Sequence, residues 1–490
     1  MILERLLLCG VLMAGGIAVD AEELVILHTN DTHSQIEPND RDLGGILRRK
    51  VLVDSVRAVH DNVLLIDAGD AVQGTLYFTL YGGEVERKMM NALGYDIQIL
   101  GNHEFDNGME ALAEQWRGVN AEKLSTNYDM RGTPLDTLFA PYTIKRYGNS
   151  LIGVIALNLD PKGMIADKNS EGIVYLDAIE AANATAWHLK HNEHVDGVIA
   201  VTHIGYDTSN PPTPSDIDLA AASKNIDLII GGHSHTTIDP KSPKSSAFHV
   251  VNAVGDTVLV TQTGSRGQYL GEIVVDLPSM KSDYRLLTVD RRLDDRIDRD
   301  AASILEPYKA GVERLMGERI GRLDKEMSSS SDLLLNWVAD VMLEMGDRLS
   351  PDSNVDLSIV NKGGIRRGLP KGDITMGQIM TMLPFDNHLV LLELEGSDLI
   401  GAFKVMEHRG GDGVSAGFDW RNIDPERLYR VVTIDYLANG GDYMEPLTHG
   451  KITARSDEKL DEVMIKYIVE KKNKTITVSY THLRAHETVL

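Results

Sequence analysis

The chain has 490 residues, 42% of them hydrophobic, and a formal net charge of −24. A single hydrophobic core usually stops growing at roughly 250–300 residues, so the length predicts two domains. The negative charge argues against binding to a nucleic-acid polymer, because such binding requires clustered Lys and Arg. A small anionic substrate would therefore need locally placed cations or a metal ion.

The first residues have the pattern of an export signal. An apolar run from Leu6 to Val19 is too short to span a bilayer as a helix, and polar residues follow it. We predict a signal peptide over 1–21 and a periplasmic or secreted protein without a stable membrane anchor; the alternative is a buried helix of the mature domain. Cleavage would remove Cys9, the only cysteine, so neither a disulfide nor a Cys-ligated metal would be available.

Short apolar runs alternate with helical stretches over residues 23–297. The runs are rich in Val, Ile and Leu, as expected for strands of a sheet that is covered on both faces. They span 24–27, 63–66, 96–100, 151–155, 198–201, 228–230 and 258–260. We therefore predict an α/β or α+β layered domain.

A second unit follows a connecting segment. Residues 298–323 keep helix-forming composition, which predicts a helix within a linker over 298–327, and a run of four serines then marks a boundary. Residues 328–477 are predicted to form a smaller α/β domain, with helices near 333–345 and 460–470 and strands near 357–360 and 389–394. The tail over 478–490 resembles a translated sequencing adapter and is left out of the functional argument.

Side chains typical of metal ligands and catalysts follow five of the predicted strands. In α/β proteins ligands bind outside the carboxyl ends of strands, so these five segments can meet in one crevice although they are far apart in sequence. Each motif alone has an ordinary explanation as a turn or a helix cap, but the repetition favours a shared site. The residues are Asp31, His33, Asp70, Asn102, His103, Asp106, His203, His233 and His235.

The spacing and chemistry of these residues favour two metal ions. Asp31 and His33 are two residues apart, like the later histidine pair, and an extended segment would turn both side chains to one side. A mixed set of Asp, Asn and His suits Zn, Mn or Fe, and Asp70 could bridge two ions about 3.5–4 Å apart. Two ions neutralise a phosphate ester and make hydroxide available near pH 7.

The order of the motifs resembles that of the calcineurin-like metallophosphoesterases, and the chain from about Glu23 to Thr477 resembles the bacterial and animal 5'-nucleotidase family. The resemblance implies a two-sheet βαβ sandwich and hydrolysis of nucleoside 5'-monophosphates. Its catalytic pair falls on His103 and Asp106. Position 235 is often Gln in relatives, so His235 could alter metal preference. One ion would take Asp31, His33, Asp70 and His235, and the other Asp70, Asn102, His203 and His233.

Three C-terminal segments also match the family, at 361–366, 383–387 and 435–442. An aromatic pair could stack on a base, an Arg could grip an anion and an Asp could accept from ribose hydroxyls, although an aromatic after Leu-Pro could equally belong to the core. One cation that many relatives place near position 330 is absent, and Lys362 replaces a usual Gly. The positions that contact base, ribose or phosphate in relatives fall on Asn361, Arg366, Phe385, Tyr436 and Asp442.

Other activities stay open at this stage. The nearest alternative is a 2',3'-cyclic-nucleotide 2'-phosphodiesterase with 3'-nucleotidase activity, but those relatives tend to carry Asn where this chain has Asp106. Hydrolysis of UDP-sugars or of nucleoside di- and triphosphates could coexist. A catalytically inactive binding or adhesion protein on the same fold would be expected to have lost ligands. The sequence does not predict the oligomeric state.

Overall fold

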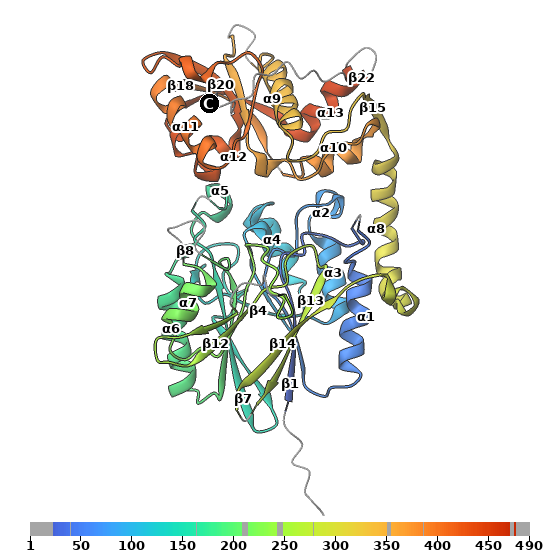
Figure 1. Cartoon of the computed structure of the whole chain (residues 1–490), viewed down its shortest axis with the longest axis vertical. Helices are drawn as coiled ribbons and strands as arrows, with labels where there is room; N and C mark the ends of the chain where they lie inside the picture. The colour runs from blue at the N-terminus through green and yellow to red at the C-terminus, as the bar shows by residue number, and fades with distance from the viewer. Residues whose placement is uncertain are drawn as a thin grey trace, which may run out of the picture.

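The computed structural model describes residues 23–39, 41–162, 164–207, 214–242, 248–277, 279–349, 354–385, 387–470 and 475–476. The chain forms two lobes. In Figure 1 the N-terminal lobe, blue to olive, lies below the C-terminal lobe, which is orange to red. The predicted signal peptide and the predicted adapter tail lie outside the described residues.

Two six-stranded sheets form the N-terminal lobe, which confirms the layered α/β prediction. The first has the order β14-β13-β1-β2-β3-β4 and the second β11-β12-β10-β9-β7-β6. Neighbouring strands run parallel from β1 through β4, and likewise among β7, β9, β10 and β12. The strands are β1 Glu23–Thr29, β2 Val63–Asp67, β3 Ile97–Ile99, β4 Glu122–Leu124, β6 Tyr142–Tyr147, β7 Ser150–Asn158, β9 Gly197–His203, β10 Leu228–Ile230, β11 His249–Val251, β12 Thr257–Thr261, β13 Tyr269–Asp276 and β14 Lys281–Thr288.

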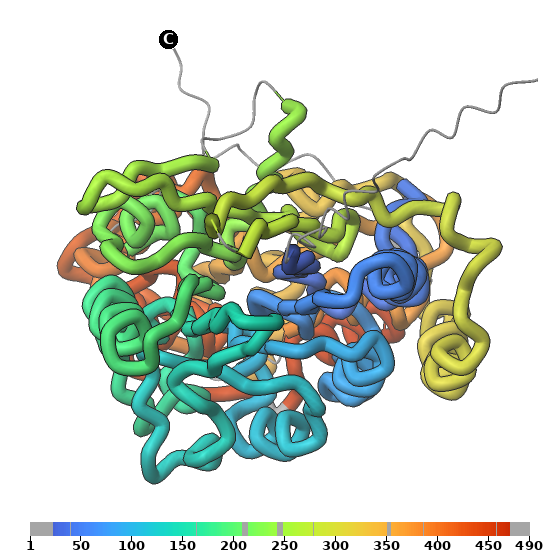
Figure 2. Tube along the Cα trace, turned by 90° about the horizontal axis from the view of Figure 1, so that it is seen from below, coloured from blue at the N-terminus to red at the C-terminus, as the bar shows by residue number. Residues whose placement is uncertain are grey.

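Strand β1 shows how the layers pack. Leu24 and Ile26 point into the core between the two sheets, whereas Val25 and Leu27 point into the core under the helices, because side chains alternate along a strand. The helices α1 Ile46–Arg57, α3 Glu84–Leu93 and α4 Met109–Arg117 cover this outer face, and α6 Ala178–His191 and α7 Asp216–Ala222 cover that of the second sheet. Figure 2 shows these two sets of helices on opposite sides. All strands of the lobe's centre are therefore covered on both faces.

Helix α8 connects the lobes along one side of the molecule (Figure 1, yellow). It spans Arg299–Gly317 and begins at Asp298, whose side chain accepts a hydrogen bond from Ala301 N. The predicted helix over 298–323 is wrong after Gly317, because β15, Arg319–Leu323, follows. The buried side chains of β15, Ile320 and Leu323, pack into the core of the C-terminal lobe, so tertiary packing overrides local helix propensity here.

A five-stranded sheet of order β19-β16-β20-β18-β21 forms the centre of the C-terminal lobe, beside a small sheet of order β17-β15-β22. The hydrophobic core of the C-terminal lobe begins at Ile320, which precedes the serine run over 328–331. Ser331, the last residue of that run, caps the N-terminus of α9. The limits 23–297, 298–327 and 328–477 stay predictions. The elements are α9 Asp332–Gly346, β16 Leu357–Val360, β17 Gly372–Thr375, α10 Met376–Met382, β18 His388–Glu395, α11 Gly396–His408, β19 Gly413–Val414, β20 Leu428–Ile434, α12 Asp435–Ala438, β21 Lys451–Lys459, α13 Leu460–Glu470 and β22 Thr475–Ile476.

Among the described helices, none combines the length and the apolar character that a membrane span requires.

Candidate metal centre and substrate cleft

The candidate ligands all lie where strands of the two sheets end. Asp31 follows β1, Asp70 follows β2, Asn102 follows β3, and His203 is the last residue of β9, while His233 and His235 follow β10. Because parallel strands direct their carboxyl ends to the same edge of a sheet, side chains that are up to about two hundred positions apart meet there. The structure thus brings together every ligand position that the sequence indicated.

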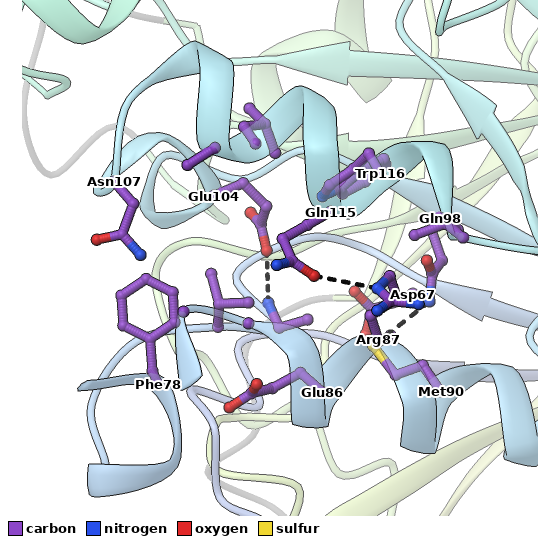
Figure 3. Close-up of a pocket in the computed structure, with 17 residues that line it drawn as sticks. Asp67, Phe78, Glu86, Arg87, Met90, Gln98, Glu104, Asn107, Gln115 and Trp116 are labelled. Atoms are coloured by element: carbon purple, nitrogen blue, oxygen red, sulfur yellow. Dashed lines mark hydrogen bonds between the residues drawn. The ribbon is translucent and has the colours of Figure 1, made fainter. Parts of the chain in front are cut away.

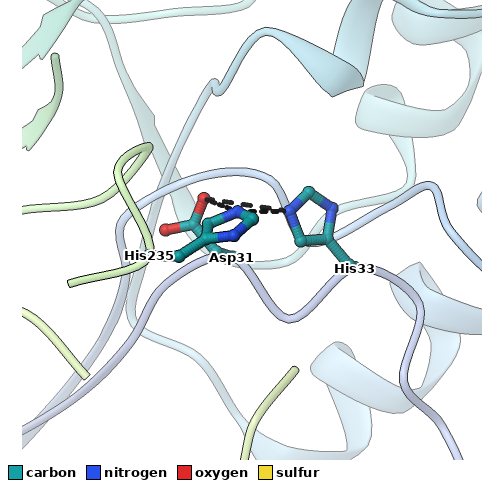
Figure 4. Close-up of side chains that lie close together, drawn as sticks. All are labelled: Asp31, His33 and His235. Carbon is teal, nitrogen blue, oxygen red and sulfur yellow. Dashed lines mark hydrogen bonds and ion pairs between the residues drawn. The ribbon is translucent and has the colours of Figure 1, made fainter. Parts of the chain in front are cut away.

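Three of these side chains form a first group. The ligand atoms of Asp31, His33 and His235 lie within 4.8 Å of one another. His33 Nε2 is 2.9 Å from His235 Nε2, and His235 Nε2 is 3.4 Å from Asp31 Oδ1. In Figure 4 the two imidazole rings and the carboxylate converge on one point. One carboxylate and two imidazoles are a donor set that suits Zn, Mn or Fe.

A second group lies directly beside the first. The ligand atoms of Asp70, His203 and His233 again fall within 4.8 Å of one another, and Asn102 Oδ1 is 3.0 Å from His233 Nδ1. Asp70 Oδ2 lies 3.2 Å from His203 Nε2 and 4.0 Å from His33 Nε2 of the first group. Asp70 therefore stands between the two groups, where a bridging carboxylate would be needed.

The backbone at these positions is not extended, so the sequence-based reason for pairing Asp31 with His33 is wrong. Their φ angles are 50° and 46°, and those of Asp70, His233 and His235 are 54°, 76° and 56°. Such left-handed conformations cost roughly 1–2 kcal/mol for each residue other than Gly. Backbone hydrogen bonds hold them: Asp31 N donates to Gly69 O at 2.9 Å, and His33 N donates to Asp70 O at 3.0 Å. Turns, not strand alternation, aim these side chains.

The charges of the centre favour bound cations. Asp31 and Asp70 are fully buried, and Ala68 O accepts a hydrogen bond from His203 Nδ1–H at 2.7 Å. Nε2, the other ring nitrogen of His203, faces Asp70 Oδ2 at 3.2 Å, so the imidazole is oriented by the backbone and turned toward the shared carboxylate, as in a metal ligand. Burial lowers the pKa of His203, but Asp70 and Asp31 raise it to about 10. These residues fit a divalent metal pair.

His103 and Asp106 lie at the rim of this centre. His103 Nδ1 is 2.9 Å from Asp106 Oδ2, and its ring centroid is 5.4 Å from that of His33. Burial lowers the pKa of His103, but the carboxylates of Asp106 and Asp70 raise it to about 9. Asp106 therefore favours the charged form of the imidazole, and Nε2 is the ring nitrogen that Asp106 does not contact.

A cleft of about 560 Å³ separates the lobes above the metal ligands. From below it is lined by Asp70, His103, Asp106 and the ligand histidines of β10, and also by α5, Asp167–Ser170. The ring centroid of Phe385 lies 5.9 Å from that of His103, so the lobes touch across the cleft. All five substrate positions predicted for the C-terminal lobe line it: Asn361, Arg366, Phe385, Tyr436 and Asp442.

Of the two cations that the sequence suggested for the cleft, Arg366 lines it and Lys362 does not. Arg366 is half-buried, and its guanidinium lies 5.7 Å from the centroid of the Phe385 ring. Among the described residues, Arg366 and Lys168 are the Arg and Lys side chains that line the cleft. Lys362 is exposed and does not line it, so it does not replace the cation that relatives place near position 330.

Sequence reasoning missed Arg409, which organises the far side of the cleft. Asp442 Oδ2 accepts from Arg409 Nη2 at 2.7 Å and from Asn361 Nδ2 at 2.5 Å. Its other oxygen lies 3.4 Å from Tyr436 OH, and Tyr436 OH accepts from Asp442 N at 3.2 Å. Oδ2 of Asp442 is thus held by two protein donors at short distance, whereas the contact of Oδ1 with Tyr436 OH is long. An Arg at the end of α11 carries no sequence signal for this contact.

Comparisons with known proteins confirm the resemblance. The calcineurin-like phosphoesterase family model matches residues 24–237, and the 5'-nucleotidase C-terminal domain model matches 316–419. Snake venom 5'-nucleotidase of Gloydius brevicauda is 30% identical over 437 residues, which cover 81% of this chain and 72% of that protein. The trifunctional nucleotide phosphoesterase protein YfkN of Bacillus subtilis strain 168 is 28% identical over 86% of this chain, which spans 32% of its length.

Among solved structures, the 5'-nucleotidase precursor from Thermus thermophilus is similar over both lobes. It superposes with a TM-score of 0.78 at 29% identity, covering 93% of this chain and 98% of that chain. The N-terminal lobe is that of a calcineurin-like phosphoesterase, a fold class that uses divalent metals. The chain therefore belongs to the 5'-nucleotidase family and is a hydrolase that acts on phosphate esters.

Proposed function

We propose that the chain hydrolyses nucleoside 5'-monophosphates to nucleoside and phosphate with the help of two divalent cations, such as Zn or Mn. The observation that carries this proposal is that both ligand groups open into the same cleft as an aromatic pair and a half-buried Arg. The phosphate end and the base end of a nucleotide thus each meet suitable chemistry. A volume of about 560 Å³ lies within the range of ligand sites, roughly 300–1,000 Å³.

Seven side chains would hold the cations. When bound, two such ions neutralise the charge of a phosphoryl group and supply hydroxide near pH 7. Asp70 would be shared, which its position between the two groups supports. We assign Asp31, His33, Asp70 and His235 to one ion and Asp70, Asn102, His203 and His233 to the other.

His103 and Asp106 would act as the catalytic pair. The protonated imidazole of His103 would donate a hydrogen bond from Nε2 to the phosphoryl oxygens, where negative charge grows in the transition state. Asp106 accepts from Nδ1 at 2.9 Å, which fixes the ring and favours its charged form. No Ser or Cys nucleophile is required by this arrangement.

The C-terminal lobe would select the nucleoside. Phe385 and Tyr436 would stack on the base, and Arg366 would bind the phosphate. Asp442 Oδ1 would accept a hydrogen bond from a ribose hydroxyl, while Asn361 Nδ2 donates to the other carboxylate oxygen at 2.5 Å.

We also propose that the protein is exported. The apolar leader supports cleavage before about Glu22, and mass spectrometry of the mature N-terminus of secreted protein would test it.

A phosphate-release panel tests the substrate assignment. Purified protein is stripped with a chelator, resupplied with Mn or Zn, and given AMP, 3'-AMP, 2',3'-cyclic AMP, ATP, UDP-glucose and p-nitrophenyl phosphate. We expect AMP to have the highest kcat/KM and the stripped protein to be inactive. A preference for 3'-AMP or 2',3'-cyclic AMP would instead establish the cyclic phosphodiesterase alternative, and turnover of ATP or UDP-glucose would widen the substrate class.

A further inference from the structure

A second, smaller cavity lies next to the loops that carry the metal ligands, and Asn107 lines both this cavity and the substrate cleft. It is bounded by α3 and α4 and by the loops that follow β2 and β3, and Glu86 and Glu104 both line it. In Figure 3 the side chain of Glu104, from the segment after β3, points toward the neighbouring backbone, and a dashed line marks a hydrogen bond to it. Glu104 stands beside His103 in the sequence, yet the proposed chemistry gives it no role.

The carboxylate of Glu104 accepts three backbone hydrogen bonds from two loops that carry ligands. Its Oε2 accepts from Asp70 N at 3.0 Å and from Gly101 N at 2.6 Å, and its Oε1 accepts from Ala71 N at 2.9 Å. The left-handed conformation at Asp70 makes the consecutive N–H groups of Asp70 and Ala71 converge, as in the backbone nests that bind anions. Here the anion is a side chain of the protein.

The contact is reciprocal. Glu104 of the second loop binds the backbone of the first, and Asp70 Oδ1 of the first loop accepts from His103 N of the second at 2.9 Å. A side chain at Gly101 would collide with Asp70, so the two loops touch directly. The carbonyls of Asp70 and Ala71 accept in turn from His33 N and Ser34 N, both at 3.0 Å. Three ligand-bearing loops therefore depend on one arrangement.

We propose that Glu104 is a positioning residue whose carboxylate fixes the loop carrying Asp70 against the loop carrying Asn102 and His103. It sets the spacing between the shared carboxylate and the other ligands without touching substrate. The inference rests on the proposed function, since the ligand assignments come from there. Side chains that orient ligands typically contribute about 10–100-fold to metal affinity, which is the effect expected of Glu104.

Glu104→Gln is the sharpest variant because it keeps the shape of the side chain. An amide has only one acceptor oxygen, so in its better orientation the NH₂ group faces Ala71 N–H, and one buried donor loses its partner. Glu104→Asp keeps the charge but shortens the reach, so it cannot span both loops. Glu86→Gln is the matched control: Glu86 is 2% exposed and lines the same cavity, and its carboxyl group interacts with the side chain of Ser34 rather than with the backbone N–H groups of Asp70, Ala71 and Gly101.

The experiment measures Mn²⁺ affinity of the chelator-stripped full-length variants by calorimetry, with circular dichroism and thermal unfolding alongside. We expect Mn²⁺ affinity to fall about 10–100-fold in Glu104→Gln and in Glu104→Asp, with secondary structure retained, and to stay at the wild-type level in Glu86→Gln. If Glu104→Gln does not fold, Glu104→Asp decides. Wild-type affinity in a folded Glu104 variant, or an equal loss in Glu86→Gln, overturns the proposal. A wild-type protein that binds no Mn²⁺ overturns the proposed function instead.

Discussion

The two walls of the cleft are built by different means. In the N-terminal lobe, strand ends and backbone hydrogen bonds place the ligands, and Asp31 and Asp70 are almost fully buried. In the C-terminal lobe, side chains hold one another, and the side chain of Asp442 is 25% exposed. The ligand positions of the N-terminal lobe depend on the backbone of the two sheets, so a substitution there is expected to disturb several ligands at once. The side chains of the C-terminal lobe can be substituted one at a time without moving the backbone. We therefore predict that substitutions there change nucleotide preference, whereas substitutions among the ligands abolish the reaction.

Asp70→Asn should have the largest effect. The change keeps the shape of the shared ligand but removes the charge that would bridge the two cations, so metal content and hydrolysis of every ester should fall together to background. Metal analysis of the purified variant, beside p-nitrophenyl phosphate turnover, checks this. Full metal content with undiminished turnover would contradict the bridging role.

His103→Asn should lower kcat by roughly two to four orders of magnitude, the usual range for positioned acid–base or charge-stabilising groups, while metal content stays unchanged. Asp106→Asn, which only loses the partner of that imidazole, should be milder. Steady-state kinetics with metal analysis separates the two variants. Metal loss in His103→Asn would make His103 a ligand and refute its assignment.

Phe385→Ala and Tyr436→Ala should affect the other wall alone. Loss of a base–aromatic stack costs about 1–3 kcal/mol, which is on the order of tenfold to a hundredfold in kcat/KM for AMP. p-Nitrophenyl phosphate has no nucleobase, so its hydrolysis should stay near wild type. The measurement is the ratio of kcat/KM for AMP to that for p-nitrophenyl phosphate. An unchanged ratio in both variants would refute the assignment of Phe385 and Tyr436 to the base pocket.

Arg409→Lys should have the smallest effect. It keeps a positive charge near Asp442 but loses one of the two guanidinium contacts, and a single hydrogen bond contributes about 0.5–1.5 kcal/mol net. We expect KM for AMP to rise about two- to tenfold with kcat nearly constant, because ribose binding is weakened and the metal centre is not. A lower kcat with constant KM would place Arg409 in the reaction step.

Prediction from sequence succeeded where local pattern and global topology agree. The strands, the layered α/β architecture and the meeting of the ligand positions follow from apolar runs that end in polar loops, whereas the two-sheet arrangement was implied by the family resemblance. The direction in which individual side chains point was not predictable. Asp31 and His33 point to the same site because both have left-handed backbone conformations, which the hydrophobic periodicity of the sequence does not predict. The end of α8 was missed because the burial of Ile320 depends on a sheet formed with distant strands. Arg409 and Glu104 were missed because their partners are backbone or side chains brought near only by folding.

The left-handed ligand residues also link metal binding to folding. Five strained positions and two neighbouring buried carboxylates raise the free energy of the N-terminal lobe, and any ligand that binds only the folded state stabilises it by mass action. The C-terminal lobe has its own core and contributes none of the seven ligands. Removal of the ions should therefore lower the melting temperature of the N-terminal lobe and leave that of the C-terminal lobe unchanged. Metal supply would then control the stability of the folded protein as well as its turnover.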